Sequence, residues 1–218
     1  LGIFEAGAQR AREGLGFPQY SNDDVVIPGL VELGYSLEDA RDYTVAACWE
    51  FIIPGVGMDI PNIAAVNFPA LVNDCAKRHL ESCADFSQFQ RAFSDELCAL
   101  CRDTLKSTRP LRMIPAPFLS VLMDGCMERG RDISFGGRYN NYGFHGVGLA
   151  TAIDSLDAIR RCVYEEKTHT ARQMLDVIDG CAPGELLRQL RYDLPKFGTD
   201  DDGVNETAVW LLRCWGDA

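Results

Sequence analysis

A thiol and a carboxylate two residues apart are the first candidates for chemistry in this sequence. Cys48 lies in TVAACW, residues 44–49, a run of small and β-branched residues that predicts a buried strand, and Glu50 follows it. Residues i and i+2 of an extended segment point to the same side, so both groups could face one substrate while Trp49 packs behind them. An S–H bond is weak enough for a cysteine to relay hydrogen atoms, and a carboxylate beside it can remove a proton. Taken alone, Cys48 would more often be an inert buried thiol, so the surrounding sequence must decide.

The segments next to this pair predict a short helix, a dry pocket and a constrained loop. SLEDARDY, residues 36–43, begins with a capping pattern in which Ser36 accepts from the backbone of Asp39 while the Asp39 carboxylate reaches back. The apolar residues 51–53 suit a pocket that excludes water. Two prolines and two glycines within 54–61 predict a loop.

The rest of the chain is predicted to be mostly helical. Apolar spacing and end signals indicate helices over 63–81, 86–106, 117–130, 155–166, 170–179, 184–192 and from 200 to about 215. Asp85 or Ser87 is placed to cap the second of these helices, and Gly130 is placed for a left-handed cap at the end of the third. The glycine-rich segment 132–150 is expected to be loop or tight turn with close backbone approach. No repeat or linker divides the chain, and strands between helices indicate an α/β layout. The helices outweigh the strands, as expected for part of a larger barrel wrapped in helices.

Composition excludes several classes of partner. The net charge is −11 with no basic block, which disfavours binding to nucleic acid or to an acidic membrane and favours a small-molecule substrate. No apolar run reaches the roughly 20 residues that span a bilayer, and no signal peptide is visible, so we expect a cytoplasmic protein. Nine cysteines, an odd number, predict free thiols.

Other motifs have simpler structural explanations. Cys98 and Cys101 form a CxxC, but their spacing places both on an apolar helix face, so we expect no metal there. The three histidines are scattered, which gives no support for a hydrolase pairing. The run 136–148 lacks the lysine of a phosphate loop. The acidic run 200–202 is explained by a helix N-terminus.

Four stretches resemble the pyruvate formate-lyase-like glycyl radical enzymes. They are YSNDDVVIPGLVELGYSLEDARDYTVAACWE (20–50), PAPFLSVLMDGCMERGRDIS (115–134), GGRYNNYGFHGVGLATAIDSLDAIRRCVYEEK (136–167) and PKFGTDDDGVNETA (195–208). They come in the family's order and cover nearly the whole chain, so together they are far more specific than one short motif.

The resemblance implies a ten-stranded α/β barrel of which this helix-rich chain is an incomplete part, with residues 1–218 forming one barrel segment. In such enzymes a finger loop carries a cysteine into the barrel centre, and Cys48 falls at that position. A second loop carries a glycine that stores a backbone radical, and its Arg-Val-x-Gly-Tyr pattern does not occur in these residues. We therefore expect a piece of a longer protein that is inactive alone.

The Cys-x-Glu arrangement resembles the eliminases of this family. It implies a dehydratase or lyase that cleaves a C–O, C–N or C–S bond through a thiyl radical at Cys48, with Glu50 as the general base. Pyruvate formate-lyase has adjacent cysteines, so Ala47 disfavours acyl transfer of the formate acetyltransferase type. Two alternatives stay open. One is an arylacetate decarboxylase with Trp49 and Phe51 lining a flatter pocket, and the other is a non-catalytic barrel segment that only binds a ligand or partner.

Further expectations follow from the same resemblance. Asp59 and Asn62 are candidate substrate-binding residues, because many eliminases carry a polar residue in this region. No cofactor or metal is expected to be bound here, and the glycyl radical, expected outside this segment, is installed by an S-adenosylmethionine and iron–sulfur activating enzyme. The expected partners are a small substrate, that activating enzyme and a second copy of the full-length protein, in an anaerobic cytoplasm. The family commonly has Gly-Cys-Val-Glu-Pro where residues 47–51 are ACWEF, so the substrate stays open.

Overall fold

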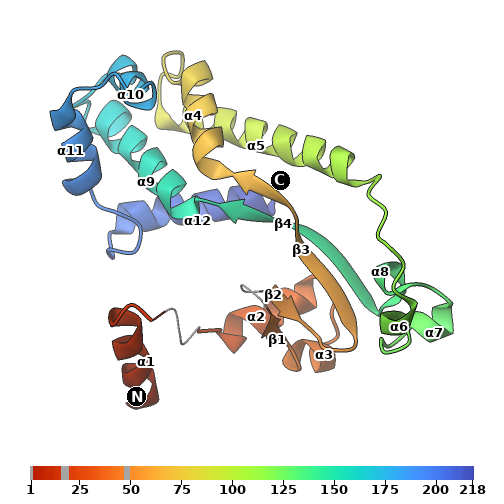
Figure 1. Ribbon diagram of the computed structural model, residues 1–218. Helices are drawn as coiled ribbons and strands as arrows, with labels where there is room; N and C mark the ends of the chain where they lie inside the picture. The colour runs from red at the N-terminus through yellow and green to blue at the C-terminus, as the bar shows by residue number, and fades with distance from the viewer. Residues whose placement is uncertain (1, 16–19, 47–49) are drawn as a thin grey trace. The chain divides into compact units, whose positions relative to one another are not determined.

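The computed structural model describes residues 2–15, 20–46 and 50–218 (Figure 1). It is a helix-rich α/β structure that divides into two compact units. The first unit comprises residues 1–60 and 114–141, and the second comprises 61–113 and 142–218. Two strands, β3 and β4, begin in the first unit and end in the second.

The first unit holds short helices and a small hairpin. Its elements are α1 (Gly2–Arg12), α2 (Asp23–Glu32), α3 (Leu37–Arg41), β1 (Thr44–Ala46), β2 (Glu50–Ile52), the first part of β3 (Gly57–Asn67), α6 (Pro117–Ser120), α7 (Cys126–Arg129), α8 (Ile133–Gly136) and the start of β4 (Tyr139–Val147). Leu30, Tyr35, Ala40 and Ile53 form its buried core, against which side chains of the hairpin and of β4 pack. The hairpin is thereby held by residues that precede and follow it in the chain.

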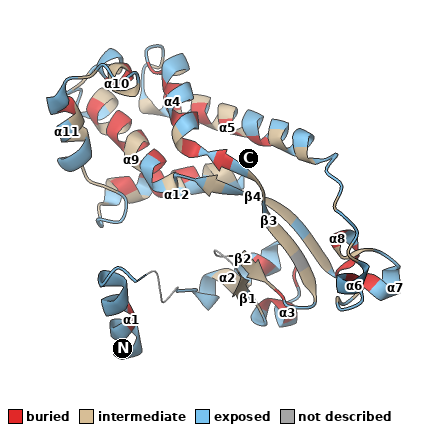
Figure 2. Ribbon diagram, in the orientation of Figure 1, coloured by how far each residue is buried: buried red, intermediate tan, exposed pale blue. Residues whose placement is uncertain are grey.

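The second unit is built around longer helices. Its elements are the rest of β3 and β4, α4 (Phe68–His79), α5 (Phe86–Thr108), α9 (Leu149–Ile159), the π-helix η1 (Arg160–Glu165), α10 (Ala171–Ile178), α11 (Gly184–Tyr192) and α12 (Asp202–Gly216). Its core contains the fully buried Phe68, Phe89, Phe93, Leu97 and Leu156 (Figure 2). The predicted cap of α5 is confirmed, because the Asp85 carboxylate accepts from the backbone N–H of Gln88 at 2.8 Å.

The predicted strand over 44–49 is confirmed for its described part, residues 44–46, but it is not buried, because Thr44 is exposed and Val45 and Ala46 are half-buried. β1 pairs antiparallel with β2, with Thr44 opposite Ile52, Val45 opposite Phe51 and Ala46 opposite Glu50. The sequence interpretation missed β2, which is short and follows β1 after three residues. The predicted loop over 54–61 is correct only as far as Val56, because Gly57 begins β3.

Two glycine-rich or apolar segments are strands rather than the predicted loop or helix. β4 occupies residues 139–147 of the segment 132–150, and β3 continues through 63–67, where a helix was expected. Gly57 lies beside Tyr139 and Gly148 beside Pro69, so β3 and β4 run in the same direction (Figure 1). The predicted close backbone approach is confirmed at Gly146, although within a strand rather than a loop, since a Cβ there would lie 2.8 Å from the Phe68 ring.

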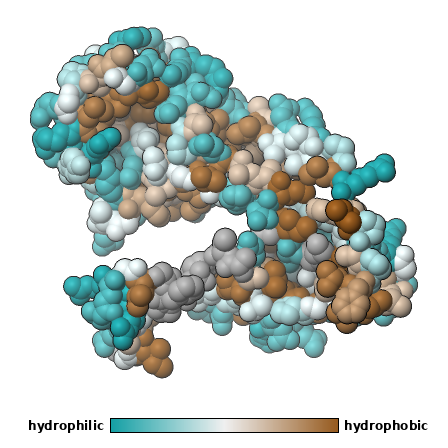
Figure 3. All heavy atoms as spheres, in the orientation of Figure 1, coloured by the Kyte–Doolittle hydropathy of each residue, from teal (hydrophilic) through white to brown (hydrophobic). Residues whose placement is uncertain are grey.

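The predicted helix over 117–130 is wrong. The segment forms the separate short helices α6 and α7, because Gly125 takes a left-handed backbone with φ of 86°. The predicted left-handed cap at Gly130 is correct, with φ of 57°. These short helices leave apolar side chains exposed, and brown surface gathers in this region in the space-filling view (Figure 3). The most exposed of them are Phe118, Leu122 and Met127.

Within the described ranges, no helix combines the length and the apolar character needed to cross a bilayer.

The close approach at Gly146 gives a stability prediction. In Gly146→Ala the new Cβ would lie 2.8 Å from Phe68 and 2.9 Å from Trp215, two side chains packed edge to face. We expect the free energy of unfolding to fall by about 1–3 kcal/mol, the usual cost of overpacking, as measured by urea denaturation. Gly184→Ala, with no atom within 4 Å of its new Cβ, is the matched control and should leave stability unchanged or raise it by up to about 1 kcal/mol, because alanine favours the helix. Equal effects of both substitutions would contradict this packing.

Candidate active site

The predicted thiol lies in the connection between β1 and β2. Ala46 pairs with Glu50, so Cys48 belongs to the three residues that join the strands. Cys48, Trp49 and Ala47 lie outside the described residues. The prediction that the thiol and the Glu50 carboxylate face the same side therefore stays a prediction. What the structure fixes is the hairpin that carries them.

Glu50 and Phe51 begin β2 at the base of this connection. Glu50 is partly buried and lies opposite Ala46. Phe51 lies opposite Val45, contacts the edge of the Tyr43 ring at a centroid distance of 5.5 Å and packs against the core of the first unit. Phe51 thus anchors the hairpin, and its predicted contact with substrate stays a prediction.

Asp59 lies on β3 with both carboxylate oxygens hydrogen-bonded. The hydroxyl of the buried Tyr35 donates to Oδ2 at 2.8 Å, and the backbone N–H of Asn141 donates to Oδ1 at 3.2 Å. The Asn141 side chain in turn donates to the Tyr35 hydroxyl oxygen at 2.5 Å. Burial, followed by the Asp59 carboxylate, raises the pKa of Tyr35 above its ordinary value. Tyr35 is therefore a protonated donor at neutral pH.

A second carboxylate, Asp39, is held by a different set of donors. It accepts from the Tyr139 hydroxyl at 2.6 Å, from the Ser36 hydroxyl at 2.8 Å and from the Arg138 guanidinium at 3.0 Å. These partners, Tyr139 first, lower the pKa of Asp39. The predicted capping pattern is half right. Ser36 accepts from the Asp39 backbone, but the Ser36 N–H donates to Tyr139 rather than to the Asp39 carboxylate.

Sequence reasoning missed Tyr35, Tyr139 and Asn141 as members of these networks. The usable signal was the alternation of β4, because Tyr139 and Asn141 are two residues apart on one strand and so share a face. That signal was hidden when the segment was predicted to be a loop. Tyr35 gave no signal, since it follows a helix at a turn.

The remaining predicted residues lie in the second unit. Asn62 is exposed on the second-unit part of β3. Cys101 is buried on α5 and Cys98 half-buried, and burial raises the pKa of Cys101, so this CxxC has the character of packed thiols. Among the described residues, no group of three or more histidine, cysteine or acidic side chains could hold a metal ion.

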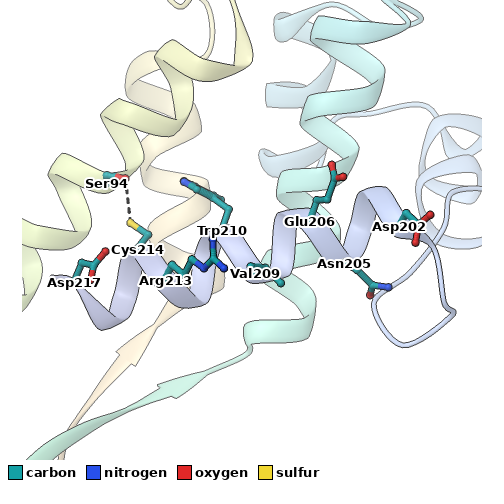
Figure 4. A pocket seen from close by; sticks show the side chains of 9 residues that line it. All are labelled: Ser94, Asp202, Asn205, Glu206, Val209, Trp210, Arg213, Cys214 and Asp217. Carbon is teal, nitrogen blue, oxygen red and sulfur yellow. Dashed lines mark hydrogen bonds between the residues drawn. The ribbon is translucent and has the colours of Figure 1, made fainter. Parts of the chain in front are cut away.

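A hollow of about 740 Å³ lies along α12 in the second unit and was not predicted. Figure 4 shows Ser94 of α5 joined to Cys214 of α12, whose hydroxyl and sulfur are 3.0 Å apart. The lining of the hollow also includes Trp210, whose ring centroid is 5.7 Å from that of Phe93. These contacts are packing contacts between two helices, so we assign the hollow no chemistry.

Comparisons with known proteins give the family. The family model described as pyruvate formate lyase-like matches residues 3–215. The chain is 28% identical to a (2S)-3-sulfopropanediol dehydratase of Klebsiella oxytoca, over 94% of this chain and 28% of that protein. It is 29% identical to an isethionate sulfite-lyase of Bilophila wadsworthia (strain 3_1_6), over 94% of this chain and 28% of that protein.

A solved structure concerning 1,2-propanediol dehydration in Roseburia inulinivorans superposes with a TM-score of 0.83 at 27% identity, over 97% of this chain and 30% of that one. The fold is accordingly part of the α/β barrel of glycyl radical enzymes, as the sequence predicted. The chain belongs to the pyruvate formate lyase-like family. It spans less than a third of the length of the curated relatives it matches.

The Asp39 network gives a prediction about pH. A carboxylate whose pKa is lowered by folding stabilises the fold above its ordinary pKa of about 4, and this contribution is lost as pH falls through the lowered value. We expect Asp39→Asn to lower the urea midpoint of unfolding at pH 7. The difference between this midpoint and that of the unsubstituted protein should become smaller below about pH 4. Asp42→Asn serves as the control, because Asp42 is an exposed carboxylate directly after the end of α3. This substitution should change the urea midpoint little. A difference that is constant from pH 7 to pH 3 would refute the assignment.

Proposed function

We propose that the protein containing this chain is a glycyl radical dehydratase or lyase that cleaves a C–O, C–N or C–S bond of a small substrate. The observation that carries this proposal is the Cys48-x-Glu50 arrangement on the β1–β2 connection in a chain of this family. The dehydratases and the lyase among its relatives support the reaction class.

Cys48 would begin and end the reaction on the substrate. A thiyl radical at Cys48 takes a hydrogen atom from a carbon that bears a hydroxyl, so that the C–H bond breaks and an S–H bond forms. After the neighbouring bond has broken, the same S–H returns the hydrogen atom to the product radical and the thiyl radical is restored. The step needs no external oxidant, because the electron count is unchanged over one cycle.

Glu50 would act as the base between these two hydrogen transfers. A hydroxyl on a carbon radical is more acidic than an ordinary alcohol, and a carboxylate within reach can take its proton. The neighbouring leaving group then departs with the bonding electron pair as water, amine or sulfite, taking up a proton where needed. The position of Glu50 as the first residue of a strand fixed at Phe51 suits this role.

Asp59 would bind the substrate's hydroxyl or ammonium groups. Its carboxylate is partly accessible on β3 and is held by neutral donors. Trp49, Phe51 and Asn62 are the further candidates for lining the pocket. Trp49 and Phe51 would exclude water and dissolved oxygen from the pocket and so protect the radical.

The glycyl radical, when installed, would take the hydrogen atom of the Cys48 thiol and so generate the thiyl radical. We place its glycine outside these residues. We further propose that 1–218 form one segment of a longer cytoplasmic barrel enzyme that pairs with a second copy and with an S-adenosylmethionine-dependent activating enzyme. The exposed Phe118, Leu122 and Met127 support this, because apolar surface of this kind is normally covered.

The alternatives are separable by experiment. Acyl transfer is disfavoured because Ala47 replaces the neighbouring cysteine. An arylacetate decarboxylase would release CO₂ from an arylacetate and leave a diol unchanged. A non-catalytic barrel segment would give no doublet radical signal in electron paramagnetic resonance after anaerobic activation of the whole protein.

The role of Cys48 gives the first functional prediction. In the activated whole protein, Cys48→Ala should lower turnover of glycerol or 1,2-propanediol at least about 1,000-fold, since no other group replaces the S–H bond. The glycyl radical signal should stay at the level of the unsubstituted protein. Cys181→Ala, at an exposed thiol, is the control and should retain activity. Turnover by the Cys48 variant would exclude the proposed mechanism.

The role of Glu50 is tested separately from hydrogen transfer. Glu50→Gln should lower product formation by about 100- to 10,000-fold, the usual contribution of a general base. Hydrogen abstraction should continue, so substrate recovered from D₂O should contain deuterium delivered by the Cys48 thiol, as measured by mass spectrometry. Glu32→Gln, at an exposed residue that ends α2, should behave as the unsubstituted protein. Loss of deuterium incorporation together with product would assign Glu50 to substrate binding instead.

A further inference from the structure

The two carboxylate networks of the first unit differ in one respect that bears on function. Asp39 is paired with the Arg138 guanidinium, which also pairs with Asp124. Asp59 receives hydrogen bonds from a phenol, Tyr35, and from a backbone N–H, neither of which carries charge. Among the residues that the structure describes, no cation is paired with Asp59. The negative charge of Asp59 therefore stays available to a ligand.

The hydrogen bonds around Asp59 also have a fixed direction. The Asn141 side-chain N–H donates to the Tyr35 oxygen at 2.5 Å, so it occupies a lone pair of that oxygen. The Tyr35 hydroxyl hydrogen is thereby directed to Asp59, whose Oδ2 is 2.8 Å away. The Tyr35 ring is itself fixed, since it is 5% exposed and lies 4.2 Å from the Tyr139 ring.

We propose that Tyr35 and Asn141 are positioning residues that hold the Asp59 carboxylate in one orientation for a substrate with neighbouring hydroxyl groups or with a hydroxyl and an ammonium group. An ionised carboxylate has about four lone-pair sites, and Tyr35 and the Asn141 backbone take one on each oxygen. The remaining sites accept from the substrate. This inference rests on the substrate-binding role of Asp59 in the proposed function.

The Asp59 carboxylate and its neutral donors also favour a particular class of substrate. An uncompensated carboxylate attracts hydroxyl and ammonium groups and repels sulfonate and carboxylate groups at the same position. Because the Asp59 charge is offset only by neutral donors, the site favours polyols and amino alcohols over anionic substrates. The raised pKa of Tyr35 agrees, since the phenol stays a donor over the pH range in which enzymes work.

The test compares two tyrosines that each donate to an aspartate. Tyr35→Phe removes the hydroxyl that bonds Asp59 and keeps the ring in the core. Tyr43→Phe removes a hydroxyl that bonds Asp23 at 2.6 Å in the same unit and is the matched control. In the whole protein we expect Tyr35→Phe to raise the KM for glycerol, 1,2-propanediol or choline about tenfold, with kcat within about threefold, while Tyr43→Phe leaves both unchanged.

A double-mutant cycle with Asp59→Asn separates positioning from general stability. If Tyr35 acts through Asp59, Tyr35→Phe should raise KM no further once Asp59 is Asn, whereas a purely structural tyrosine would add its full effect. Urea midpoints of Tyr35→Phe and Tyr43→Phe, measured alongside, identify any effect that comes from stability. Additive effects on KM, or an unchanged KM in Tyr35→Phe, overturn the positioning inference.

Equilibrium binding of the same three compounds to the unactivated whole protein distinguishes failure of this inference from failure of the proposed function. Binding that weakens about tenfold in Tyr35→Phe supports the inference even if no radical turnover is found, in which case the radical chemistry fails. Turnover that depends on Cys48 but not on Tyr35 or Asp59 leaves the radical function standing and overturns the inference. Absence of binding and turnover with all three compounds overturns the substrate class proposed here.

Discussion

A hairpin of only three residue pairs must be held by contacts outside itself, and the first unit depends on this constraint. An isolated two-stranded sheet is marginal in water, and β1 and β2 offer few hydrogen bonds. The missing stabilisation comes from Phe51 and Ile53, which join a core made with Leu30, Tyr35 and Ala40. The connection that contains Cys48 therefore follows and precedes strands that are held by this core, which suits the radical role that we propose for Cys48.

The same core connects the hairpin to the two carboxylates. Tyr35 is a core residue on its ring side and a hydrogen-bond donor at its hydroxyl, so apolar packing and the position of Asp59 are set by one side chain. Asp39 is fixed by Arg138 and Tyr139 and ties α3 to the start of β4. Asp39 thus has an arginine partner, while Asp59 has only neutral donors among the described residues, which is the basis of the binding role that we propose for it.

Some elements followed from local sequence and others did not. The long helix α5 and its Asp85 cap were predicted correctly, because amphipathic spacing and a capping side chain act within a few residues. The segments 117–130 and 132–150 were predicted incorrectly. In the first, Gly125 interrupts an apolar pattern that is otherwise helical. In the second, the expected close approach occurs within a strand, at Gly146 beside Phe68, rather than in a loop or turn. Neither reason is visible without the neighbouring elements.

The sequence by itself determined the family, the α/β class and the Cys48-x-Glu50 pair, because these depend on residue order and short spacing. Only the tertiary structure brought Tyr35, Asp59 and Asn141 together, since they are 24 and 82 residues apart along the chain. It also distinguished Asp59 from Asp39, two aspartates that look alike in sequence and differ in whether an arginine meets them. The physical reason is that a charge acquires its role from the groups packed around it, and those groups come from strands and helices that local patterns do not pair.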